Sequence, residues 1–83
     1  NAYTISNGEY EVIEAEIIET SELINKEIKN SNLPDDIRIG AVLRDKKVII
    51  PKSDFVFQKN DNVVFIAKND SIPIVENIFR LSQ

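Results

Sequence analysis

Hydrophobic and polar residues alternate in two stretches of the chain, and this period of two predicts β-strands with one face in water. The first stretch covers 11–18, where Glu14 and Glu16 share the polar face. The second covers 37–43 and places on one face Ile37, Ile39, Ala41 and Leu43. The opposite face of the second stretch carries Arg38. It also carries Arg44, which directly follows the last residue of the stretch.

Two more strands follow. The dipeptide Asp45-Lys46 predicts a tight turn into a strand over 47–50, which Pro51 ends because proline cannot donate to a β-ladder. The stretch 62–68 holds five consecutive apolar residues, which is typical of a strand that is buried on both faces.

Helical spacing of apolar residues predicts two helices. The first covers 21–30, with Ser21 as an N-cap that accepts from free backbone amides. The second follows a cap at 69–71 and tolerates Pro73 in its first turn. Its apolar stripe consists of Ile74, Val75, Ile78 and Phe79.

These elements predict an α+β fold of two layers, in the order β-α-β-β-β-α, with a mixed sheet and helices packed on one face. Residues 1–9 are expected to form a flexible lead-in, with Asn1-Ala2 as a remnant of a tag, and residues 10–83 to form the domain. The chain has no initiator methionine, so we interpret it as part of a longer protein.

The length, the net charge and the apolar runs of the chain limit the classes of function that it can have. A domain of 83 residues buries only roughly 60–65% of its unfolded surface, and dimerisation would relieve this marginal stability. The net charge of −4 argues against binding to nucleic acid, whose phosphates an acidic surface repels. Direct membrane insertion is not expected, because no apolar run reaches the roughly 20 residues of a membrane span.

The residues needed for common catalytic chemistry are missing. The chain has no histidine, no cysteine and only two glycines, which excludes Ser-His-Asp and Cys-His catalysis, the usual zinc sites and a glycine-rich phosphate loop. We therefore expect no enzyme activity, no catalytic residues, no metal site and no cofactor. Six glutamates between 9 and 22 allow two interpretations, a calcium site or a solvated surface.

Arg38 and Arg44 also allow two interpretations. Six residues of extended strand separate them by roughly 20 Å, so they cannot hold one phosphate within a single chain. Across a two-fold axis, two copies of either arginine could converge on one anion. Alternatively, each forms a surface salt bridge with one of the many carboxylates.

Several segments in a fixed order resemble the RCK C-terminal (TrkA-C) domain family. They are SELINKEI at 21–28, NLPDDIRIGAVLRD at 32–45, VIIP at 48–51, NDNVVFIA at 60–67 and IVENIFR at 74–80. Asn25 and Asn60 depart from the family pattern, which has glycine at or near both places. Asparagine enters left-handed backbone conformations more readily than other non-glycine residues, so we expect both turns to survive.

The resemblance implies a cytoplasmic regulatory domain of a potassium transport system. Such domains form homodimers and sense a small ligand at the dimer interface, which in some members is cyclic di-AMP. For this chain the resemblance therefore implies cyclic di-AMP or another nucleotide as the ligand. The resemblance places Ile37, Arg38 and Ile39 at that groove, and implies a potassium channel or transporter membrane subunit as partner through the full-length protein. Two alternatives remain open: a structural dimerisation module without a ligand, and the same domain attached to another permease or antiporter.

Overall fold

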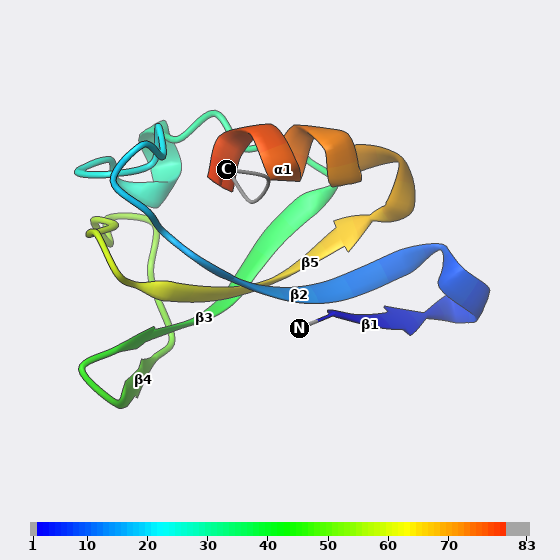
Figure 1. Cartoon of the computed structure of the whole chain (residues 1–83), viewed down its shortest axis with the longest axis horizontal. Helices are drawn as coiled ribbons and strands as arrows, with labels where there is room; N and C mark the ends of the chain where they lie inside the picture. The colour runs from blue at the N-terminus through cyan, green and yellow to red at the C-terminus, as the bar shows by residue number, and fades with distance from the viewer. Residues whose placement is uncertain (1, 80–83) are drawn as a thin grey trace.

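The computed structural model describes residues 2–79, which form one five-stranded sheet in the order β1-β2-β5-β3-β4, covered on one face by a helix (Figure 1). The strands are β1 Ala2–Ile5, β2 Tyr10–Glu16, β3 Ile37–Arg44, β4 Lys47–Ile49 and β5 Asn62–Lys68. The helix α1 covers Ile72–Phe79, and three short 3₁₀ turns are η1 Ser6–Gly8, η2 Ile28–Asn30 and η3 Asn69–Ser71. The expected α+β class is confirmed.

The sheet differs from the expected mixed sheet, because each of its four strand pairs is antiparallel. The long connection 17–36 brings β3 back in the same direction as β2, but β5 lies between the two and pairs with both. The expected lead-in also contains regular structure. Within it, β1 pairs with the first half of β2.

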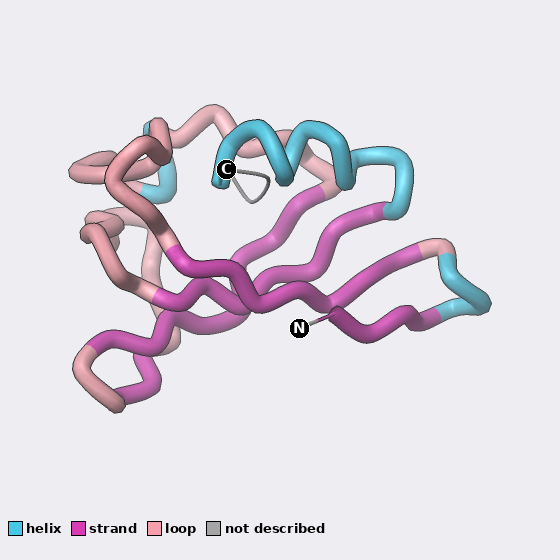
Figure 2. Tube along the Cα trace, viewed as in Figure 1, coloured by secondary structure: helices cyan, strands magenta, loops and turns pink. Residues whose placement is uncertain are grey.

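The core lies between the sheet and a layer made of α1 and the long connections (Figure 2). From α1, it receives Val75, Ile78 and Phe79, as the predicted stripe requires, whereas Ile74 is 45% exposed. Phe65, at the centre of β5, stacks on Phe79 with ring centroids 4.8 Å apart and an interplanar angle of 4°. This stack joins the two layers.

The helix expected over 21–30 is absent, because tertiary pairing takes its backbone groups. The amides of Asn25 and Ile28 donate to the carbonyls of Phe57 and Phe55, at 2.9 and 3.0 Å, instead of to carbonyls one helical turn back. Asn25 also has φ of 65°, which no α-helix accommodates. Turns and the single 3₁₀ turn η2 replace the helix.

Ser21 has a different capping role from the one predicted. Its hydroxyl oxygen accepts from the amide of Leu23 at 3.2 Å, as an N-cap would, but no helix follows. The same hydroxyl donates to the carbonyl of Ile78 at 3.0 Å, in the last turn of α1, where carbonyls lack helical partners. Ser21 therefore fastens the connection after β2 to the end of α1.

A β-bulge at Gly40 divides β3 into two halves with opposite facing. Ile39 pairs with Phe65, but Ala41 pairs with Val64, so one extra residue of β3 lies between the two pairs. Ile37 and Ile39 face the core as predicted, whereas beyond the bulge it is Val42 that is fully buried. The prediction that Arg38 and Arg44 share one face is therefore wrong.

The turn predicted at Asp45-Lys46 is confirmed, and both of its residues have positive φ, 52° and 66°. This is the signature of the type I′ turn, which favours glycine at its second position. We expect Lys46→Gly to raise the free energy of unfolding by about 0.5–1 kcal/mol, because left-handed conformations cost lysine about 1–2 kcal/mol and glycine's greater freedom when unfolded offsets part of that gain.

Urea unfolding monitored by circular dichroism measures this change. Lys47→Gly is the matched control, because Lys47 lies in the paired strand β4. The same substitution there should lower the stability of the protein. A Lys46→Gly variant no more stable than the parent would contradict the assignment of strain to this turn.

Both asparagines that depart from the family pattern occupy left-handed positions. Asn25 has φ of 65° and Asn60 has φ of 74°. The two turns therefore keep the backbone conformation that glycine would adopt. Asn60 then places Asp61, its neighbour, in the interior.

Candidate functional site

A pocket of about 240 Å³ opens beside the first half of β3, next to η2 and the turn that follows it. It contains all three residues expected at the ligand groove, and its lining is Ile28, Lys29, Asn32, Leu33, Ile37, Arg38 and Ile39. The sequence had not indicated the four residues from 28–33. Their only local signal is the turn-forming run Asn30-Ser31-Asn32, in which Asn32 has φ of 53°.

The pocket exists because β4 is too short to cover β3. β4 pairs only with Val42–Arg44, so the edge of β3 from Ile37 to Gly40 has no strand partner on that side within residues 2–79. At this edge the amide of Ile37 donates to the carbonyl of Pro34. The carbonyl of Ile37 accepts from Arg38 Nη1 at 3.1 Å. Alternate residues of a strand direct their backbone groups to the same edge, so Ile39 directs its own toward the pocket.

Apolar walls and cationic groups meet in this pocket. Ile28, Leu33 and Ile39 pack against the core, while Arg38 is exposed to solvent. Lys29 lies 3.8 Å from a Glu27 carboxylate oxygen, an exposed and weak ion pair from which an anion could draw it. An apolar cleft with two cations and a free backbone edge suits a ligand with a flat apolar part and an anionic part.

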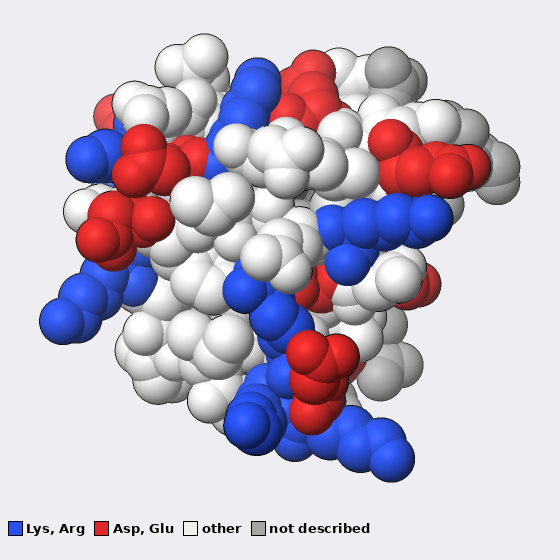
Figure 3. Space-filling model, turned by 90° about the vertical axis from the view of Figure 1, so that its left-hand side faces the viewer, with Lys and Arg blue, Asp and Glu red and all other residues white. Residues whose placement is uncertain are grey.

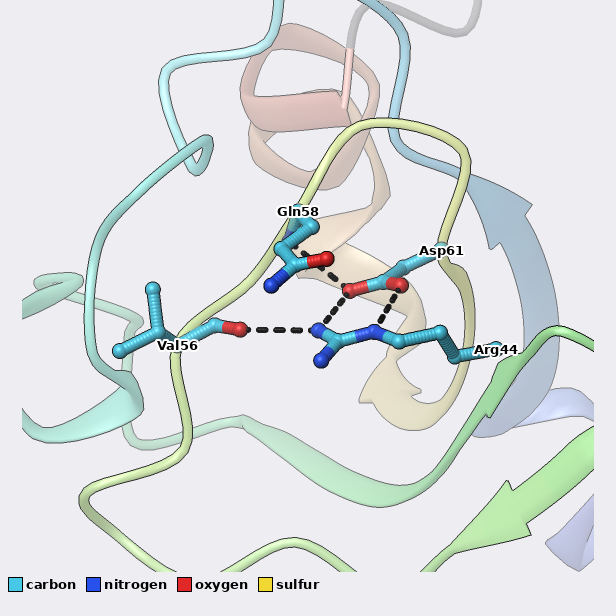
Figure 4. A network of polar contacts seen from close by, with 4 residues as sticks. All are labelled: Arg44, Val56, Gln58 and Asp61. Carbon is cyan, nitrogen blue, oxygen red and sulfur yellow. Dashed lines mark hydrogen bonds and ion pairs between the residues drawn. The ribbon is translucent and has the colours of Figure 1, made fainter.

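Arg44, the second candidate for anion binding, uses its guanidinium group for contacts within the chain. Its Nε and Nη2 donate to the two carboxylate oxygens of Asp61 at 2.8 and 2.7 Å, and Nη2 also donates to the carbonyl of Val56 (Figure 4). The guanidinium lies 4.7 Å from the ring centroid of Phe55, within cation–π range. Asp61 also accepts from the amide of Gln58 at 2.8 Å.

Arg44 therefore acts as a structural group. Its hydrogen bonds with Asp61 raise the pKa of Arg44 above its ordinary value, although burial opposes this rise. Because the pKa of Arg44 is higher in the folded state, the interaction with Asp61 contributes its full stability to the fold at any pH below the ordinary pKa of arginine. That contribution is lost only at higher pH, beyond any working range. Arg44 thus stays charged, and of the two arginines only Arg38 is available to a ligand.

The glutamates between 9 and 22 do not converge. Among residues 2–79, no group of three acidic side chains could hold a metal ion, and Glu19 lies 3.7 Å from Lys59 instead. A second pocket, of about 330 Å³, is formed by the polar loops at 7–9 and 68–70 and has no wall from the core. The α-helix of the described chain has eight residues, too few to cross a membrane.

Comparison with known proteins agrees with this fold. The model of the TrkA-C domain family matches residues 12–80. The Trk system potassium uptake protein TrkA of Azorhizobium caulinodans is 40% identical over 80 residues, and its homolog from Archaeoglobus fulgidus is 30% identical over 76. These alignments cover 96% and 92% of this chain but only 18% and 17% of the relatives, so the chain spans less than a fifth of their length.

Solved structures give the same result. The RCK_C domain dimer of S. agalactiae BusR in complex with c-di-AMP is 25% identical, with a TM-score of 0.73 over 84% of this chain and 96% of that one. A structure of S. agalactiae BusR with its busA-promotor DNA has a TM-score of 0.74 at 21% identity, over 98% of this chain and 42% of that one. With a family model matching residues 12–80, the chain belongs to the TrkA-C domain family, also called RCK_C.

Proposed function

We propose that the chain is a non-enzymatic, cytoplasmic regulatory domain of a potassium transport system, and that this domain dimerises and senses a small anionic ligand in the pocket beside β3. The pocket lined by Ile37, Arg38 and Ile39 carries the proposal, because it combines apolar walls with the exposed cationic side chains of Lys29 and Arg38. The partner would be the membrane subunit of a potassium channel or transporter, reached through the longer protein to which such a domain belongs.

Cyclic di-AMP fits this pocket by its chemistry. An adenine would lie against the apolar walls, the free edge of β3 would offer backbone donors and acceptors, and Lys29 and Arg38 would face a phosphate. A volume of about 240 Å³ is below the roughly 300–1,000 Å³ of ordinary ligand pockets. A ligand with two equivalent halves would therefore be shared between two copies. The BusR dimer in complex with c-di-AMP supports this arrangement.

Nucleic acid is not included in the proposed function. The net charge is −4, and the side of the molecule in Figure 3 shows lysines and arginines interspersed with acidic residues rather than gathered into a basic surface. The BusR structure with promotor DNA contains a longer chain, of which the match covers 42%.

A thermal-shift titration with cyclic di-AMP tests the proposal. A ligand that binds only the folded form adds about 2.7 kcal/mol of stability at 100 times its Kd, so the unfolding midpoint should rise with concentration. Arg38→Ala should weaken binding about 10- to 100-fold, because a charge-assisted hydrogen bond contributes about 1.5–3 kcal/mol.

Lys52→Ala is the matched control, since Lys52 is exposed and lies outside the pocket, and its loss changes the net charge equally. Equal weakening by both variants would indicate a general charge effect and contradict the site. A midpoint that cyclic di-AMP, other adenine nucleotides and divalent ions all leave unchanged would instead favour the ligand-free dimerisation module.

A further inference from the structure

One wall of the pocket beside β3 lies outside the sheet. Four of the seven lining residues come from 28–33, which contains the 3₁₀ turn η2 and the turn after it. We call residues 25–33 the wall segment. Ile28 and Leu33 pack on the core, but apolar packing is not directional and does not by itself fix a position along β3. Other contacts must therefore hold the wall segment opposite the strand.

Backbone hydrogen bonds join the wall segment to residues 53–58, which we call the supporting segment. Three amides of the wall segment donate to carbonyls of the supporting segment at 2.9, 3.0 and 2.9 Å: Asn25 to Phe57, Ile28 to Phe55 and Lys29 to Ser53. The amide of Phe57 donates back to the carbonyl of Lys26 at 3.0 Å. Glu27 and Val56 form an antiparallel bridge. The two segments thus make a short antiparallel ladder outside the main sheet.

Arg44 holds the supporting segment from its other edge (Figure 4). Its Nη2 donates to the carbonyl of Val56 at 2.9 Å, and its guanidinium lies 4.7 Å from the centroid of the Phe55 ring. Successive carbonyls of an extended segment point to opposite edges. The carbonyl of Val56 thus reaches Arg44, while the carbonyls of its two neighbours reach the wall segment. Residues 55–57 are therefore held between Arg44 and the wall segment.

Asp61 fixes Arg44 in turn. Its side chain is 2% exposed, and its carboxylate accepts two hydrogen bonds from Arg44 and a third from the amide of Gln58, in the supporting segment. Arg44 is the last residue of β3, the strand that supplies the other wall of the pocket through residues 37–39. β3 thus carries one wall directly and holds the opposite wall through Arg44. Neither Arg44 nor Asp61 lines the pocket, so neither contacts a ligand bound there.

We infer that Arg44 is a positioning residue of the ligand site, which sets the place of the wall segment opposite β3 through residues 55–57. The inference rests on the proposed function where it concerns a ligand, but the position of the wall segment can be measured in the free chain. Arg44→Lys separates charge from shape, because lysine keeps the charge beside Asp61. It loses the planar fork that bonds Asp61 and Val56 at once and stacks on Phe55.

Hydrogen exchange of the ligand-free chain, followed by NMR, tests the positioning. In Arg44→Lys the amides of Asn25, Ile28 and Lys29 should lose most of their protection, while those of β5, which has a strand on either side, should stay protected. Ile13→Val is the control, because Ile13 is a buried residue of β2 outside both segments and its truncation lowers the stability of the whole domain. Its wall amides should stay protected.

Calorimetric titration with cyclic di-AMP tests the effect on the site. A wall segment that is in place about a tenth of the time raises the apparent Kd about 10-fold, so Arg44→Lys should bind about 10-fold more weakly and Ile13→Val as tightly as the parent. Phe55→Leu is a second variant, which loses the stacked ring but keeps the Arg44–Asp61 pair. It should change exchange and affinity in the same direction by less, and it carries the test if Arg44→Lys does not fold.

The two measurements fail separately. Wall amides that stay as protected in Arg44→Lys as in Ile13→Val, in a parent chain that binds cyclic di-AMP, would overturn the inference and leave the proposed function standing. Loss of protection without loss of affinity would also overturn it, because the position of the wall segment would then not matter to the site. A parent chain that binds no cyclic di-AMP would refute the proposed ligand, while the exchange rates would still decide whether Arg44 positions the wall segment.

Discussion

Phe65→Ala is expected to lower the free energy of unfolding by about 3–5 kcal/mol, the usual cost of truncating a buried phenylalanine. Phe65 is fully buried, pairs with Ile13 and Ile39 on the adjacent strands, and stacks on Phe79 of α1. Its removal leaves a cavity between the two layers that neither can close. A domain of this length has roughly 4–12 kcal/mol of stability in total, so much of the population should unfold.

Urea unfolding at a fixed protein concentration measures this loss, since association would add to the apparent stability. Ile74→Ala is the control, because it removes an apolar side chain from α1 at a position that is 45% exposed, and it should cost less than about 1 kcal/mol. A Phe65→Ala variant that loses no more than this control would show that the stack does not hold the layers together.

Asp61→Asn should cost about 3 kcal/mol, the lower end of the range for breaking a buried ion pair. The Asp61 side chain is only 2% exposed, and its two oxygens accept from Arg44 and from the amide of Gln58. Asparagine has nearly the same shape but presents an NH₂ group in place of one oxygen. Arg44 is 25% exposed and recovers some hydration, which keeps the cost at the lower end.

Asp54→Asn is the matched control in the same connection, since Asp54 is exposed. The unfolding midpoints of both variants should be compared at neutral pH, where Asp54→Asn should change the free energy of unfolding by less than about 0.5 kcal/mol. If the two variants lose the same small amount, the Arg44–Asp61 pair contributes no more than a surface salt bridge.

Local pattern predicted most of the fold. The strands over 11–18, 37–43, 47–50 and 62–68, the turn at Asp45-Lys46 and the final helix all appear, each within a few residues of its predicted bounds. The helix over 21–30 could not be excluded by pattern, because the cause lies in residues 53–57, which pair with it from about 30 positions away. Tertiary hydrogen bonds there outweigh a modest helical propensity.

The candidate site was predictable only in part. The family resemblance predicts Ile37, Arg38 and Ile39 as ligand residues, and this stays a prediction; the structure places all three beside one pocket. A salt bridge is one of the two interpretations that the sequence allows for Arg44, but the buried position of its partner Asp61 is not predictable, because the bulge at Gly40 reverses the alternation of side chains along β3. Glycine in a strand is a signal for such a bulge, and Gly40 is the single glycine within the predicted strands.

Seven non-glycine residues of the described chain have positive φ, and four of them are asparagines. Each such residue stores conformational energy, on the order of 1 kcal/mol. Together they lower the stability of an isolated copy toward the threshold at which small domains unfold. Any partner or ligand that binds only the folded domain would then add directly to its stability, so the folded fraction would rise with the concentration of that partner or ligand.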